Sequence, residues 1–137
     1  MNGHLPVVEI LRASGPVGTY IGGSGLNTAR VFIGEAPQES LYPLIRVEIF
    51  DAEAFDTKSG PAFIDHDIVK VFCDGTLDAD IYGLAKAVRT ALEGIEGTHN
   101  GIYVENIRYL REDTYSANIT NKTVRTHEAD YEVRVRT

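Results

Sequence analysis

The sequence has one cysteine, no tryptophan and no long hydrophobic run. Because Cys73 stands alone, no intrachain disulfide can form, and we expect the chain to be made in a reducing cytoplasm. No apolar segment approaches the roughly 20 residues of a membrane-spanning helix, so we expect no contact with a membrane. The first six residues contain no basic stretch before an apolar core, so we also expect no signal peptide.

Positive charge is also scarce. Thirteen Lys and Arg residues stand against twenty Asp and Glu residues, which gives a formal net charge of -7. A dedicated DNA-binding surface is normally basic, so this balance argues against one. With 43% hydrophobic residues and a mean hydropathy of -0.14, the composition is that of a folded protein. A length of 137 residues suffices for one hydrophobic core, so we expect a single domain over residues 1–137.

The spacing of apolar residues predicts two helices and four strands. The strongest signal is a helix over Leu77–Leu92, where apolar residues repeat at helical spacing. The expected order is a short helix at about 5–12, strands from residue 44 and at about 63–72, the helix, and strands at about 102–110 and 129–136. The sequence therefore predicts an α+β fold: a twisted, mainly antiparallel four-stranded sheet, one long helix packed across a face, and a short N-terminal helix.

Two segments between the predicted strands are long and polar. Residues 52–62 and 111–126 show no alternation, so we interpret both as loops that carry partner contacts rather than stability. Phe50 and Phe63 flank the first segment and Phe55 lies within it, and we expect all three to be exposed at an interface.

No group of residues has the spacing of a catalytic or metal site. The glycines between residues 22 and 25 are not followed by the Lys-Ser/Thr of a phosphate-binding loop. Within a strand, the side chains of Asp65-His66-Asp67 would alternate between faces and could not converge on one ion. Asp74, Asp78 and Asp80 suit the start of a helix better than a calcium loop. We therefore predict no catalytic, metal-binding or cofactor-binding residue.

Several short segments have a characteristic order that runs through nearly the whole chain. They are Val7-Val8-Glu9-Ile10-Leu11, Ala29-Arg30-Val31-Phe32, Leu41-Tyr42-Pro43-Leu44-Ile45, Ala87-Val88-Arg89-Thr90-Ala91-Leu92 and Asp130-Tyr131-Glu132-Val133-Arg134-Val135. In order, spacing and length the chain resembles the tail-completion or tail-terminator proteins of long-tailed bacteriophages, the small head–tail joining family.

The resemblance implies a structural virion protein without enzymatic activity or cofactor. Such proteins form a ring, commonly six-fold, at the head-proximal end of the tail tube, where the ring stops tube polymerisation and docks to the head connector. The implied partners are further copies of the chain, the tail tube protein, the head connector or neck protein, and DNA that passes through the channel without specific binding. The implied location is the head–tail junction of the virion, after synthesis in the bacterial host cytoplasm.

Partner binding is expected on the two long polar segments, at Phe55, Asp56, Lys58, Glu112, Asp113 and Tyr115. A basic channel would hold DNA phosphates, so we expect a neutral to acidic lining, with Glu53, Asp56, Glu112 and Asp113 as candidates.

Two alternative functions stay open. The first is a neighbouring head-completion or neck connector protein. The second is a small ligand-binding or hydrolytic α+β domain that uses Asp65, His66 and Cys73.

Overall fold

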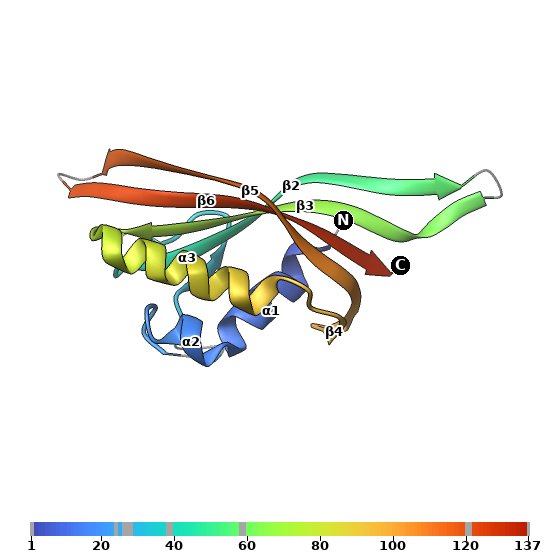
Figure 1. Cartoon of the computed structure of the whole chain (residues 1–137), viewed down its shortest axis with the longest axis horizontal. Helices are drawn as coiled ribbons and strands as arrows, with labels where there is room; N and C mark the ends of the chain where they lie inside the picture. Colours follow the sequence, from blue (N-terminus) through green and yellow to red (C-terminus); the bar gives the residue numbers. More distant parts are fainter. Residues whose placement is uncertain are drawn as a thin grey trace.

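The computed structural model describes residues 2–23, 25, 29–37, 40–57, 60–119 and 122–136, with the side chains of 51–57, 60–64, 119 and 122 left out. Its helices are α1 (His4–Ala13), α2 (Gly15–Gly18) and α3 (Asp78–Leu92). Its strands are β1 (Val31–Ile33), β2 (Leu44–Thr57), β3 (Gly60–Gly75), β4 (Gly97–His99), β5 (Ile102–Ile119) and β6 (Lys122–Arg136). Figure 1 shows the helices gathered on one side of the sheet.

The strands form one sheet in the order β1-β2-β3-β6-β5-β4, in which β1 is parallel to β2 and the other neighbours are antiparallel. The expected four-stranded sheet with one long helix is therefore wrong, because the sheet is mixed, six-stranded and curled, and three short helices accompany it. The additional strands β1 and β4 have three residues each, too few to show alternation in the sequence.

The segments 52–62 and 111–126 are strands where they are described, not loops. They are the outer parts of the hairpins β2–β3 and β5–β6, which project from opposite ends of the molecule (Figure 1). Residues 111–118 are exposed apart from the half-buried Thr114, so this part of β5 has no apolar face that would produce alternation.

The hydrophobic core lies between the helices and one face of the sheet. Val7 and Leu11 of α1 and Leu84 of α3 are fully buried. They pack in one cluster with alternate residues of the four long strands, among them Ile45, Val47, Val69, Val71, Cys73, Ile107, Ala129, Tyr131 and Val133. The buried carboxylate of Asp67 accepts a hydrogen bond of 2.8 Å from the backbone N–H of Gly3, which fixes the start of α1 on β3.

Helix α3 forms where the apolar repeat predicts it. Asp78 and Asp80 occupy its first turn, where carboxylates interact favourably with the helix dipole. Gly94 follows its end with a φ of 79°, a conformation that glycine adopts at low cost. The residues that it buries are Ile81, Leu84, Val88 and Leu92.

Candidate interaction surfaces

Among the described residues, no helix covers the second face of the sheet, and we call it the helix-free face. Along β3, Lys70, Phe72 and Asp74 alternate with core residues, so they point away from the helices. The strand register adds neighbours from the other three long strands: Arg46 and Glu48 from β2, Thr126, Glu128, Asp130 and Glu132 from β6, and Arg108, Arg111, Asp113 and Tyr115 from β5.

Cross-strand ion pairs neutralise the cations at the centre of the helix-free face. The Nζ atom of Lys70 lies 2.5 Å from Oε1 of Glu128 and 3.4 Å from Oδ1 of Asp130. The Nε atom of Arg111 lies 2.7 Å from Oδ2 of Asp130, whose residue is only 2% exposed. The hydrogen bond to Glu128 raises the pKa of the Lys70 ammonium above its ordinary value, so Lys70 remains charged and paired at neutral pH.

The same pairing continues on both sides of this centre. The Nε atom of Arg46 lies 2.6 Å from Oδ2 of Asp74, and the hydroxyl of Thr126 donates a hydrogen bond of 2.8 Å to Oδ1 of Asp74. Farther along, Arg108 lies 3.4 Å from Glu132. Arg46, Lys70, Arg108 and Arg111 therefore each have a carboxylate partner from a neighbouring strand.

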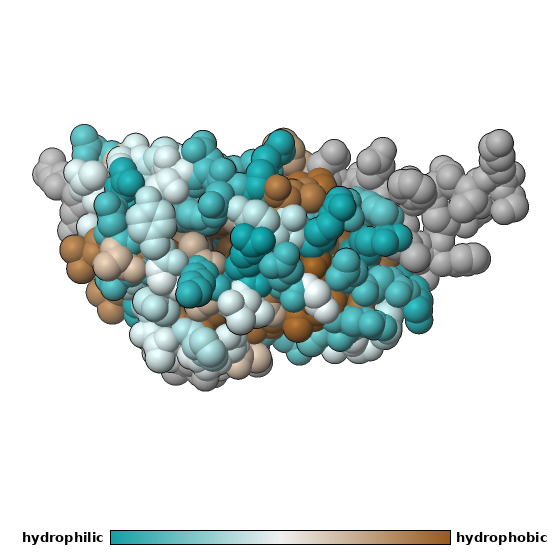
Figure 2. All heavy atoms as spheres, in the orientation of Figure 1, coloured by the Kyte–Doolittle hydropathy of each residue, from teal (hydrophilic) through white to brown (hydrophobic). Residues whose placement is uncertain are grey.

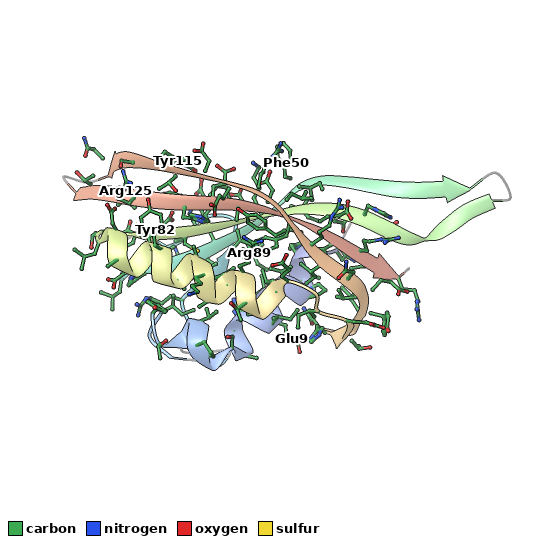
Figure 3. The ribbon with its side chains drawn as sticks, in the orientation of Figure 1. Glu9, Phe50, Tyr82, Arg89, Tyr115 and Arg125 are labelled. Carbon is green, nitrogen blue, oxygen red and sulfur yellow. The ribbon has the colours of Figure 1, made fainter. Side chains whose placement is uncertain are left out.

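Two exposed aromatic side chains stand on the helix-free face. Phe50 is 58% exposed, as the sequence predicts, and Tyr115 is 40% exposed. The Nζ atom of Lys70 lies 4.4 Å from the centroid of the Phe50 ring. Figure 3 shows Phe50 near the middle of the molecule and Tyr115 toward the β5–β6 tip, both on the side away from the helices. On the face shown in Figure 2, hydrophobic residues form small separate patches rather than one continuous surface.

Both outer edges of the sheet are largely open. β4 pairs with β5 only over Ile102–Val104, and β1 pairs with β2 only over Ile45–Val47. Within the described part of the chain, no strand pairs with the outer edge of β5 or β2 beyond these residues. The backbone N–H and C=O groups along such an edge can pair with a strand of another chain.

A groove of about 190 Å³ lies between α3 and the sheet on the helix side. In it, Nε2 of the buried His127 lies 2.8 Å from Oε2 of Glu112. The guanidinium of Arg89 lies 3.9 Å from the centroid of the Tyr109 ring. Hydrogen bonds with His127 and Tyr109 hold the pKa of Glu112 below its ordinary value of 4.5.

The lowered pKa of Glu112 predicts how the free energy of unfolding depends on pH. Because the pKa of Glu112 is lower in the folded chain, its contribution to the free energy of unfolding is complete above pH 4.5 and is lost as the pH falls through the folded-state value. We expect Glu112→Gln to lower the free energy of unfolding at neutral pH. In acid, the free energies of unfolding of the variant and the wild type should be more similar. Urea unfolding of both proteins over this pH range would measure the difference, and a constant difference would contradict the prediction.

Comparison with known proteins gives one kind of match. No protein-family model matches the chain, and no curated protein matches it. Among solved structures, a chain from the "Virion of native gene transfer agent (GTA) particle" matches with a TM-score of 0.61 and 20% sequence identity, over 96% of this chain and 92% of that chain. The two chains share a fold.

Glu112 and Asp113, which the sequence analysis predicts on one loop, lie on opposite faces of the sheet. Glu112 pairs with Ala129 in the register and faces the helix side, whereas Asp113 pairs with Glu128 and faces the helix-free side. Tyr115 lies on the same side as Asp113. Glu112 and Asp113 therefore cannot line one surface together.

The other predicted contact residues lie on or near the β2–β3 hairpin. Lys58 lies outside the described residues. The backbones of Glu53, Phe55 and Asp56 belong to β2 and that of Phe63 to β3, but their side chains lie outside the description.

The residues of the hydrolytic alternative are not brought together. Asp65 and His66 point to opposite faces of β3, and Cys73 lies roughly 25 Å farther along the strand. Cys73 is 1% exposed, and burial raises the pKa of its thiol, which disfavours a reactive thiolate. Among the described residues, no group of three or more His, Cys, Asp or Glu side chains could hold a metal ion, and no helix is long and apolar enough to cross a membrane.

Proposed function

We propose that this chain is a structural virion protein that caps the head-proximal end of a phage tail tube, ends tube polymerisation and forms the docking surface for the head connector. The observation that carries the proposal is the fold shared over 96% of the chain with a chain of a gene transfer agent virion.

The two open edges of the sheet support a ring of copies. β2, β3, β6 and β5 alternate in direction, so β2 and β5 run antiparallel to each other. In copies related by rotation about an axis along the strands, β5 of one copy meets β2 of the next as an antiparallel pair. This contact uses different surfaces on the two copies, and repeating it around an axis closes a ring, six-fold in our proposal.

Closure in this way gives the joined sheets an inner and an outer face. The helices cover one face, so we place the helix-free face toward the channel and the passing DNA (Figure 1). Because Lys70 and Arg111 are already paired with carboxylates, these two cations are not free to bind phosphates. Asp113 remains a candidate lining residue, whereas Glu112 faces the helix side.

The proposal is tested by deleting the gene and by locating the protein in virions. We expect the deletion to give headless tails of uncontrolled length, and complementation with the wild-type gene to restore virions. Gold-labelled antibody should mark only the head–tail junction in electron micrographs. Tails of normal length beside incomplete heads would favour the neck-protein alternative. Label along the whole tail, or no label in virions, would contradict both.

A further inference from the structure

The positions of the two open edges along the strands determine how neighbouring copies can meet. Ile49 of β2, Val69 of β3, Tyr131 of β6 and Tyr109 of β5 form one row across the sheet. From this row, the open edge of β2 runs toward the β2–β3 tip, whereas most of the open edge of β5 runs toward the β5–β6 tip. The two edges are therefore offset within one copy.

Strand β1 prevents two neighbouring copies from joining edge to edge with the rows of their sheets aligned. It occupies the outer side of β2 at Ile45–Val47. Through β3 and β6, Ile45 shares its row with Thr114, and Val47 shares its row with Glu112. Without an offset, β1 of one copy would occupy the space of β5 of the next copy at these rows, and the end of β2 would extend beyond the open edge of β5.

An offset toward the β5–β6 tip removes the second problem and reduces the first, because it moves β1 from the middle of the outer part of β5 to the last residues of that strand. A shift of about five to seven residues brings the open edge of β2 opposite the exposed outer part of β5, and closed barrels require such a stagger between strands. The same shift places Phe50 opposite the stretch 115–117 of the next copy, where Tyr115 is the large side chain on the helix-free face.

Resting on the ring of the proposed function, we propose that neighbouring copies join with this offset and that Phe50 of one copy packs against Tyr115 of the next. Both side chains are exposed in the single copy, at 58% and 40%, and both lie on the helix-free face. Aromatic residues that face each other across antiparallel strands stabilise the pairing of those strands. The aromatic contact fixes the register of a joint whose backbone pairing alone could slip.

Cysteine crosslinking of the full chain tests this contact. The Phe50→Cys/Tyr115→Cys variant is oxidised at a protein concentration at which light scattering shows the wild type to be oligomeric. We expect a ladder of linked copies that ends at the size of the ring. Within one copy, β2 and β5 are separated by two strands, about 14 Å, so these cysteines cannot link to each other. Cys73 is 1% exposed and should stay reduced.

The Phe50→Cys/Leu110→Cys variant is the matched control for the offset. Leu110 is also exposed on β5 and adjoins the row of Ile49, so it would meet Phe50 only without an offset. We expect no ladder from this variant or from single-cysteine variants. A ladder from the Leu110 variant would overturn the offset. Dimers from a single-cysteine variant would overturn the pairing of unlike edges.

A charge exchange gives a second measurement that needs no crosslink. Phe50→Lys and Tyr115→Glu should each reduce the oligomeric fraction, and the double variant should restore it. Absence of restoration, together with absence of a ladder, would overturn the Phe50–Tyr115 contact. This outcome is distinct from failure of the proposed function, in which the wild type itself would stay monomeric at all concentrations and be missing from the head–tail junction.

Discussion

Replacing Leu84 by alanine is expected to lower the free energy of unfolding by about 2–5 kcal/mol. Leu84 is fully buried on α3 and belongs to the cluster that joins the helices to the sheet. The substitution removes apolar atoms from this cluster and leaves a cavity that the surrounding strands can fill only in part. Urea unfolding would measure the change, with the same slope against denaturant expected for both proteins.

Leu41→Ala is the matched control, because the chemical change is the same and Leu41 is 70% exposed. We expect its effect to lie within about 0.5 kcal/mol of zero. Similar effects for the two substitutions would mean that α3 does not pack on the sheet as described.

Releasing the cations of the helix-free face is expected to create DNA binding that the wild type lacks. In Glu128→Gln/Asp130→Asn, Lys70 and Arg111 lose their carboxylate partners but keep neighbours of nearly the same shape. Two freed cations can contact two phosphates, so binding to duplex DNA should weaken roughly tenfold between about 50 and 200 mM salt. Fluorescence anisotropy with a labelled duplex would measure this binding.

The variant Asp78→Asn/Glu93→Gln controls for net charge. Asp78 pairs with Arg125 and Glu93 with Arg89, both outside the helix-free face, so this variant also loses two negative charges and frees two cations. We expect much weaker DNA binding from it at equal salt. Equal binding by both variants would show that the location of the charges is unimportant, and no binding by either would show that ion pairing does not suppress it. Thermal unfolding would confirm that both variants fold.

The sequence predicts the buried parts of the fold better than its exposed parts. The helix at Leu77–Leu92 and the strand beginning at Leu44 bury one apolar stripe or face each, and burial produces the periodicity that reveals them. The outer part of β5 is exposed on nearly all sides, so its residues carry no periodic signal. β6 between residues 124 and 128 is hidden from sequence analysis for another reason. Its buried Thr126 and His127 are held by hydrogen bonds, and polar residues do not mark a core.

The candidate surfaces show the same division. Phe50 was identifiable as an exposed apolar residue, because it lies beside a polar segment. The ion pairs of Lys70 and Arg111 were missed, because they depend on which strands are neighbours. Lys70 and Glu128 are distant in the sequence and meet only because β6 lies beside β3. Charged residues at every second position from Glu128 to Arg136 were the available signal, but the loop interpretation of 111–126 concealed the neighbouring part of β5.

The position of β6 also has a consequence for synthesis of the chain. β6 lies between β3 and β5 in the middle of the sheet, although it is the strand nearest the C-terminus. Until residues 122–136 have left the ribosome, β3 and β5 have no common partner, and the core lacks Ala129, Tyr131 and Val133. Folding must then bring together strands that are far apart in the sequence, which is slow compared with forming local contacts. The outer edges of β2 and β5 therefore become the two edges of one sheet only after β6 has paired with both β3 and β5.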